Sequence, residues 1–228
     1  MCASRTQEAT ARTLDDEMDE KKILRYMGQH APADERLKLL IKANLSKLAA
    51  CAEARHVYAV LPVKVKKNAV VFDELHISSE DLARHLEGCS KALLFAATLG
   101  AGVDRTAIRN AVANSAKAMC FQACAAEMIG EYCDEALRQT ASDLGIFLTP
   151  RFSPGYGDFD IKHQTEILRI LQTDKKIGLT QTGAHMLVPL KSVTAVIGVC
   201  QKQRYVESDK CAACNKLDCD YRAKEDSV

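Results

Sequence analysis

Three cysteines near the C-terminus have a spacing that suits metal binding. They form the run Cys211-Ala-Ala-Cys214-Asn-Lys-Leu-Asp-Cys219, and Cys200 upstream is a candidate fourth ligand. A two-residue spacing closes a tight turn, so these thiols can converge on one ion. Thiolate-only ligation favours zinc or an iron–sulfur cluster, and spacing alone does not separate the two. The alternative is a reducing C-terminal segment that binds no metal, and the sequence leaves both interpretations open.

A second group of chemically useful residues is the run Arg151-Phe-Ser-Pro-Gly155-Tyr156-Gly-Asp. Arginine offers a planar fork that holds a carboxylate through two hydrogen bonds. Glycine allows a ligand to approach the backbone closely, and tyrosine adds a ring face and a hydroxyl. The run can therefore form a loop that holds an amino-acid-like or nucleotide-like ligand. A purely structural turn explains the same residues.

Four carboxylates share one face of an expected helix, because they are three or four residues apart. They are Glu127, Glu131, Asp134 and Glu135. A solvated face is the ordinary explanation of such a stripe. Glu127 differs from the other three, because alanines, Met128 and Ile129 surround it, and a carboxylate in apolar surroundings is usually paired.

Length and composition exclude several classes of protein. The chain has 228 residues, 47% of them apolar, and its 31 basic residues nearly cancel 30 acidic ones. The near-zero net charge and the lack of a basic run argue against nucleic acid as a partner. No apolar stretch reaches the length of about 20 residues that spans a bilayer, so no membrane association is expected. The polar N-terminal segment lacks a secretory signal, which predicts a cytoplasmic protein with reduced thiols.

The elements that must position these residues follow from hydrophobic periodicity and turn residues. Helices are expected over 19–27, 32–54, 78–86, 104–140 and 161–171, with Gly130 as the point where the long helix bends or divides. Strands are expected over 57–65, 69–72, 92–98, 146–148, 186–190 and 192–200. This order is not a regular strand–helix alternation, so it predicts an α+β fold with a mainly antiparallel, twisted sheet and flanking helices. The expected organisation is a disordered leader over 1–18, an α+β domain over 19–203 and a cysteine-rich tail over 204–228.

Several of these segments together resemble a known family. The run Arg151-Phe-Ser-Pro-Gly-Tyr156 and the helix that follows it resemble the activation domain of cobalamin-dependent methionine synthase. The resemblance continues in order, from roughly Ala123 to Val199, through the segments Ala126–Glu135, Leu179-Thr180, Met186, Pro189 and Ser192-Val193-Thr194. Residues 19–122 are more similar to the shorter, standalone relatives of that domain.

The resemblance implies binding of S-adenosylmethionine. The matching positions that contact this ligand in the family are Glu127, Arg151, Ser153, Gly155 and Tyr156. Arg151 is expected to pair with the methionyl carboxylate, and Glu127 with the ammonium or the sulfonium. For a further acidic ligand, near the N-terminal part of the family's domain, the resemblance identifies no matching residue.

The resemblance also implies a reaction and its partners. A standalone chain would support reductive methylation of oxidised cobalamin held by a separate methionine synthase or related corrinoid methyltransferase, as a component of that methyltransferase. An electron donor such as a flavodoxin or ferredoxin is then required, and the C-terminal cysteines are a candidate electron relay. Two alternatives remain at this stage: an iron–sulfur or zinc-binding accessory protein that does not bind S-adenosylmethionine, and a zinc-stabilised structural subunit.

Overall fold

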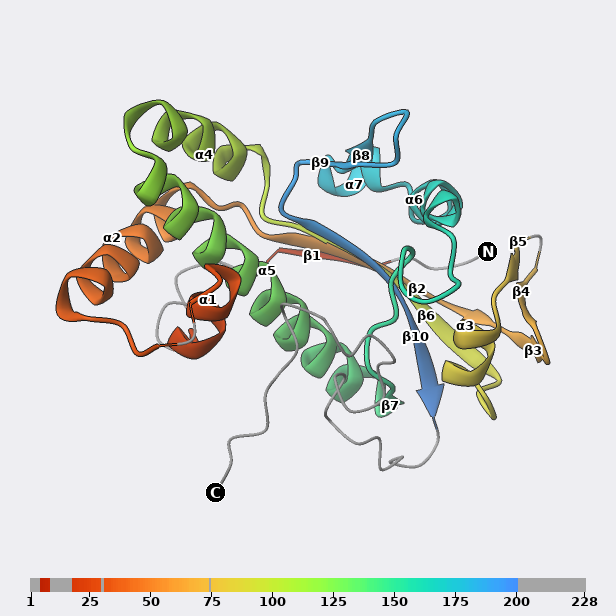
Figure 1. Cartoon of the computed structure of the whole chain (residues 1–228). Helices are drawn as coiled ribbons and strands as arrows, with labels where there is room; N and C mark the ends of the chain where they lie inside the picture. Colours follow the sequence, from red (N-terminus) through yellow and green to blue (C-terminus); the bar gives the residue numbers. More distant parts are fainter. Residues whose placement is uncertain (1–4, 9–17, 30, 74, 201–228) are drawn as a thin grey trace, which may run out of the picture.

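A five-stranded antiparallel sheet forms the centre of the molecule (Figure 1). The computed structural model describes residues 5–8, 18–29, 31–73 and 75–200. The strand order is β1-β2-β6-β10-β7. The strands are β1 (Arg5–Glu8), β2 (Arg55–Pro62), β6 (Lys91–Thr98), β10 (Ser192–Cys200) and β7 (Phe147–Leu148). The α+β fold with a mainly antiparallel sheet and flanking helices is therefore confirmed.

Strand β6 separates two apolar cores, because side chains alternate between the two faces of a sheet. Leu93 and Phe95 belong to the core on the α5 side, and Leu94 belongs to the core on the opposite face. All three are fully buried. A central strand that is apolar at consecutive positions is the pattern expected when both faces are covered.

Four helices form the first core. They are α1 (Glu20–Tyr26), α2 (Glu35–Cys51), α4 (Ala101–Ala113) and α5 (Ser115–Leu144). The long helical segment divides at Asn114, whereas the sequence analysis placed the bend or division at Gly130. Asn114 has an extended backbone, and its side chain accepts a hydrogen bond from the Lys117 amide, so it caps α5. Gly145, at a φ of 61°, ends α5 in the left-handed region.

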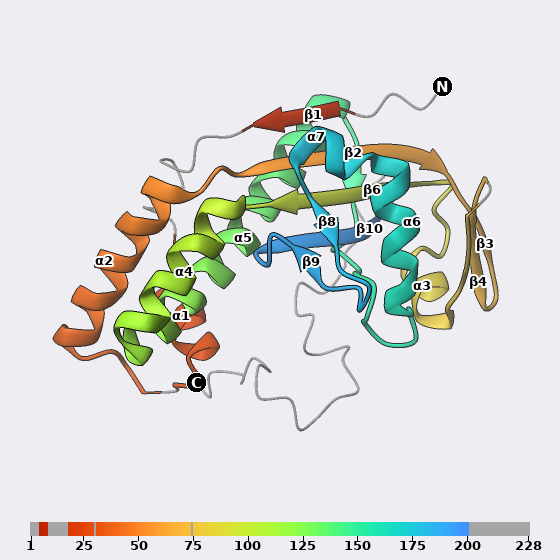
Figure 2. The same ribbon diagram turned by 90° about the horizontal axis from the view of Figure 1, so that it is seen from above.

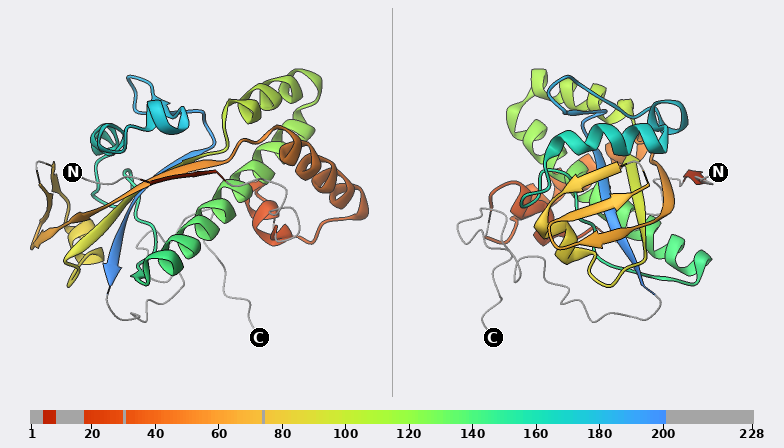
Figure 3. Two further views of the ribbon diagram at one scale, coloured as in Figure 1. Left: turned by 180° about the vertical axis from the view of Figure 1, so that it is seen from behind. Right: turned by 90° about the vertical axis from the view of Figure 1, so that its right-hand side faces the viewer.

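The opposite face of the sheet carries shorter elements. They are α3 (Glu80–His85), the 3-10 turn η3 (Ile161–His163), α6 (Gln164–Leu171), α7 (Thr173–Ile177) and the strand pair β8 (Thr180–Gln181) and β9 (Leu187–Val188). A separate three-stranded sheet contains β3 (Lys64–Lys66), β4 (Ala69–Phe72) and β5 (Leu75–Ser78). Figure 2 shows α6 and α7 over the main sheet, and Figure 3 shows the small sheet at the end of the molecule away from α2.

Several boundaries differ from the expected ones. Arg5–Glu8, assigned to a disordered leader, form β1 at the edge of the sheet and pair with β2. The strand expected over 57–65 is two strands in different sheets, β2 and β3. Strand β5, helix α7 and strand β8 were not predicted, since they have two to five residues and no extended period. The tail over 204–228 lies outside the described residues, and the proposed division of the chain into three parts stays a prediction.

None of the helices in the described part of the chain has the length and apolar character needed to cross a bilayer.

Candidate functional site

A pocket of about 430 Å³ lies at the exposed edge of β10. Among the residues that the structure describes, pairing on this edge is confined to the later part of β10: β7 pairs with Val199 and Cys200, and Phe152 forms a bridge with Val196. The first half of the strand therefore faces the pocket. Helix α5 borders it from one face of the sheet and α6 from the other. The lining residues are Tyr26, Ala126, Ile129, Gly130, Arg151, Ser153, Pro154, Tyr156, Gln164, Leu187, Leu190, Lys191, Ser192, Val193 and Thr194.

The segment from Arg151 to Tyr156 forms one wall of this pocket, as an ordered loop. Phe152 exchanges two backbone hydrogen bonds with Val196 of β10, of 3.0 and 2.8 Å. Gly155 has a φ of 93°, and its amide donates to the Phe159 carbonyl at 2.7 Å. This turn requires the left-handed region, which glycine occupies without strain. Tyr156 is 59% exposed at the mouth of the pocket, and its ring lies edge-on to that of Phe152.

Arg151 points into the pocket wall rather than into solvent. Its side chain is 13% exposed, and its guanidinium lies 2.9 Å from the Asp134 carboxylate on α5. Asp134 is 47% exposed, so the ion pair reaches the surface at one end only. A guanidinium has five N–H donors, so Arg151 can hold Asp134 and still bind a carboxylate in the pocket.

Glu127 lies behind the α5 wall and is 2% exposed. Lys22 of α1 pairs with it at 3.2 Å and with Glu131 at 2.5 Å. The predicted pairing of this carboxylate is therefore confirmed. Oε1 is the Glu127 oxygen that faces Lys22. Burial raises the pKa of Glu127 to about 7, although Lys22 acts in the opposite direction.

Tyr26, the last residue of α1, connects these charged groups. Burial raises its pKa, and the charges of Glu127 and Tyr156 raise it further, whereas Lys22 and Arg151 lower it. Tyr26 also lines the pocket, and the groups that shift its pKa include members of both the α5 wall and the loop wall. Sequence reasoning missed this residue, because one tyrosine at the end of a short helix carries no recognisable pattern.

Gln164 and Lys191 are two further pocket residues that sequence reasoning missed. The Gln164 amide nitrogen donates to the His185 carbonyl at 2.7 Å, and its oxygen accepts from the Thr194 hydroxyl at 3.1 Å. This buried amide connects α6 with β10. Lys191 follows an exposed apolar residue, Leu190, and burial lowers its pKa, with Asp104 opposing the shift.

The structure brings together most of the predicted ligand contacts. Arg151, Ser153 and Tyr156 line the pocket, Gly155 shapes their turn, and Glu127 lies just outside the lining. Of the four candidate metal ligands, Cys211, Cys214 and Cys219 lie outside the described residues. Cys200 is half-buried, and its sulfur lies 3.8 Å from that of Cys89. Within the described ranges, no three cysteine, histidine or acidic side chains gather closely enough to hold a metal ion.

The side chains that line the pocket suit the binding of a small ligand. The pocket presents a guanidinium, two tyrosines, a fixed amide and apolar side chains, which suit a zwitterion with an attached ring system. A crystal structure of the MetH reactivation domain bound to AdoHcy matches this chain with a TM-score of 0.66 and 16% sequence identity. The alignment covers 90% of this chain and 80% of that one. The chain has the MetH reactivation domain fold. No protein-family model and no curated protein matches it.

Proposed function

We propose that this protein binds S-adenosylmethionine and supports reductive methylation of oxidised cobalamin on a separate methionine synthase or related corrinoid methyltransferase. The observation that carries the proposal is Arg151, which is nearly buried in the wall of a ligand-sized pocket. The shared fold with a reactivation domain that binds AdoHcy supports it. AdoHcy is the product that remains when S-adenosylmethionine gives up its methyl group.

The charges around the pocket match the two ends of this ligand. Arg151 would hold the methionyl carboxylate, and the backbone of Ser153 and Gly155 would approach the same end. Tyr156 would cover the adenosine or the sulfonium with its ring. Glu127, next to the lining residue Ala126, would attract the ammonium or the sulfonium from behind the α5 wall.

The reaction needs placement more than acid–base chemistry. Cob(II)alamin accepts one electron and becomes cob(I)alamin, which then takes the methyl group from the sulfonium and leaves AdoHcy. No proton is transferred, so no general base is required. The task of this chain would be to hold the methyl group in line with the cobalt face. The corrinoid would remain on the partner protein, and a flavodoxin or ferredoxin would supply the electron.

Calorimetry with S-adenosylmethionine tests the proposal. Arg151→Ala should weaken binding by about 10- to 100-fold, as expected for loss of a charge-assisted contact of about 1.5–3 kcal/mol. Arg138→Ala is the matched control, because Arg138 is an exposed arginine of α5 that pairs with Glu135. Failure of the wild-type protein to bind S-adenosylmethionine at millimolar concentration would reject the proposal.

A second candidate function is an iron–sulfur or zinc-binding accessory protein of a corrinoid system, and the contact between Cys89 and Cys200 favours it. The thiol of Cys200 already has a second sulfur beside it, at the point where the described chain ends. Metal analysis, absorption spectra and paramagnetic resonance of anaerobically purified protein test this function. Absence of both iron and zinc, together with an unchanged activity of Cys211→Ser, would remove it.

A further inference from the structure

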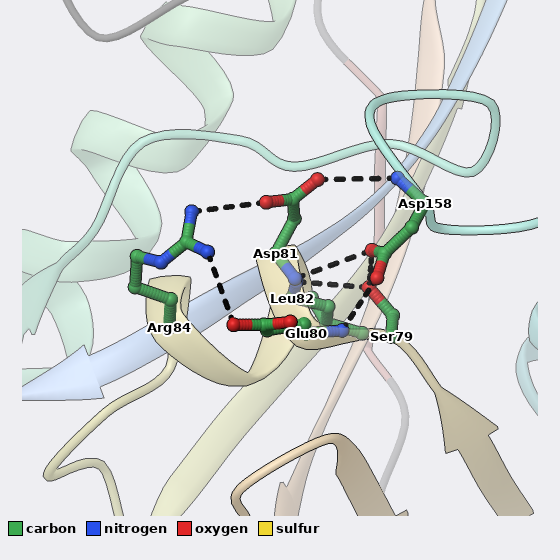
Figure 4. A network of polar contacts seen from close by, with 6 residues as sticks. All are labelled: Ser79, Glu80, Asp81, Leu82, Arg84 and Asp158. Atoms are coloured by element: carbon green, nitrogen blue, oxygen red, sulfur yellow. Dashed lines mark hydrogen bonds and ion pairs between the residues drawn. The ribbon is translucent and has the colours of Figure 1, made fainter.

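The pocket loop is fastened to helix α3 near the end of the loop. The Asp158 carboxylate accepts hydrogen bonds from the amides of Glu80 and Asp81, at 2.7 and 3.2 Å, and from the Ser79 hydroxyl (Figure 4). These amides are among those that a helix N-terminus leaves without an intrahelical partner. Ser79 also caps α3 itself, through the Leu82 amide at 2.9 Å. Asp158 therefore supplies, from a distant part of the chain, a second cap for this helix.

The contact is reciprocal. The Asp158 amide donates to the Asp81 carboxylate at 3.2 Å, and Arg84 holds that carboxylate from the other side at 3.0 Å. Gly157, at a φ of 53°, passes so close to Asp81 that a Cβ atom would overlap the carboxylate. Any side chain at this position would therefore have to displace the Asp81 carboxylate.

The other end of α3 holds the beginning of the same loop. His85 Nε2 lies 2.9 Å from the Pro150 carbonyl and 3.0 Å from the Thr149 hydroxyl. A carbonyl only accepts, so this nitrogen carries the proton and donates to Pro150. The His85 ring stacks on Phe152 with a centroid separation of 5.1 Å, and Phe152 stacks in turn on Phe159.

These contacts enclose the pocket wall without taking part in it. The segment between Pro150 and Asp158 contains Arg151, Ser153 and Tyr156, all of which line the pocket. None of the α3 residues does so. The helix therefore touches both ends of the loop without lining the pocket, so a change in α3 would reach the ligand by moving the loop.

We propose that Asp158 and His85 are positioning residues that clamp the loop at its two ends and preset Arg151 and Tyr156 for the ligand. This inference rests on the proposed function. The clamp removes loop conformations before binding, and a ligand that meets a preset loop loses less of its affinity to ordering. Helix α3, which carries no ligand contact, thereby sets the affinity of the site.

Calorimetry with S-adenosylmethionine tests the clamp. Asp158→Asn keeps the shape of the side chain but loses the charge, and Asp158→Ala loses the contacts altogether. We expect Asp158→Asn to weaken binding about 3-fold and Asp158→Ala to weaken it 10-fold or more. The melting temperature should fall by only a few degrees in both variants. Asp160→Asn is the matched control, because Asp160 lies on the same segment and its carboxylate contacts only the nearby Lys162 among the described residues. His85→Gln, which retains a donor for Pro150, should bind more tightly than His85→Ala.

A second measurement does not depend on the ligand. In the ligand-free protein, amides of residues 151–159 should exchange with deuterium at least several-fold faster in Asp158→Ala than in the wild type, while those of β6 stay unchanged. Unchanged exchange in the loop would overturn the clamp, and so would unchanged affinity in Asp158→Ala. If the wild type fails to bind S-adenosylmethionine, the proposed function fails, and the exchange measurement alone decides the clamp.

Discussion

The two walls of the pocket are built by different means. The α5 wall is a continuous helix that packs on α1, α2 and the sheet, and its charged residue Glu127 is sealed from solvent with Lys22 beside it. The loop wall buries few apolar side chains of its own, chiefly Pro154 and Phe159, and hydrogen bonds with β10 and α3 hold it in place. One wall has a fixed backbone, and the other has a backbone that depends on a few hydrogen bonds.

Because of this difference, the charge of the site and its geometry should respond to different substitutions. Substitutions in the α5 wall should change the charge of the pocket and its dependence on pH, with little effect on geometry. Substitutions in or beneath the loop should change geometry and affinity, with little effect on pH dependence. Four variants, in one wall, in the other or in the ion pair that joins them, test this separation.

Gly157→Ala should have the largest effect. A methyl group here must displace Asp81 and adopt a φ of 53°, so we expect a stability loss of about 2–3 kcal/mol and at least 10-fold weaker ligand binding. Gly145→Ala is the control, because its φ is 61° but a Cβ would meet nothing within 4 Å. Gly145→Ala should lower the free energy of unfolding by about 1 kcal/mol, from backbone strain alone. It should leave the affinity for S-adenosylmethionine unchanged. Equal effects of the two changes in denaturant unfolding would contradict the proposed role of the Asp81 contact.

Lys22→Met tests the α5 wall and should have the next largest effect. It leaves Glu127 buried with no ion-pair partner among the described residues, so the free energy of unfolding in denaturant at pH 8 should fall by about 1–2 kcal/mol. This figure is below the usual range for a buried pair, because Lys22 is 42% exposed and water weakens the attraction. The loss should shrink at pH 5, where Glu127 takes up a proton. Lys38→Met, which breaks an exposed pair with Glu35, should not change stability measurably.

The sequence predicted the parts of the fold that have a long, regular pattern. The buried strand expected over 92–98 is confirmed as β6, and the helix expected over 78–86 is confirmed as α3. The division of the long helix was misplaced, because alanine-rich sequence on both sides of Asn114 hides a capping residue in a helical pattern. Gly130, expected to divide the helix, instead lines the pocket, where the absence of a side chain leaves room.

The candidate site was predictable only where its residues are close in sequence. The run from Arg151 to Tyr156 carries its own turn chemistry, and an isolated acid among apolar residues marked Glu127. Tyr26, Gln164 and Lys191 reach the pocket from three separate elements, so no spacing connects them with the loop. The α3 contacts with Asp158 likewise join residues nearly eighty positions apart, which only the tertiary fold brings together.

Glu127→Gln should alter the pH dependence of stability. Burial raises the pKa of Glu127 from 4.5 to about 7, so its contribution to stability is complete below pH 4.5 and is lost as the pH rises through 7. The difference in unfolding free energy between the wild type and Glu127→Gln should therefore move in favour of the variant between pH 4.5 and pH 8. Glu135→Gln, on the exposed side of α5, serves as the control, and a pH-independent difference for Glu127→Gln would contradict the assignment.

Asp134→Asn should have the smallest effect and is the most direct comparison of the two walls, because the ion pair with Arg151 joins them. A half-exposed pair of this kind contributes at most about 1 kcal/mol, so stability should barely change. Asp134 and a bound carboxylate share one guanidinium, and neutralising the former should tighten binding of S-adenosylmethionine by up to about 3-fold. Calorimetry of this variant beside Arg151→Ala distinguishes two roles for Asp134. Tighter binding would show that Asp134 competes with the ligand for Arg151. Weaker binding would show that Asp134 helps to position the arginine. The α5 wall would then affect the geometry of the site as well as its charge.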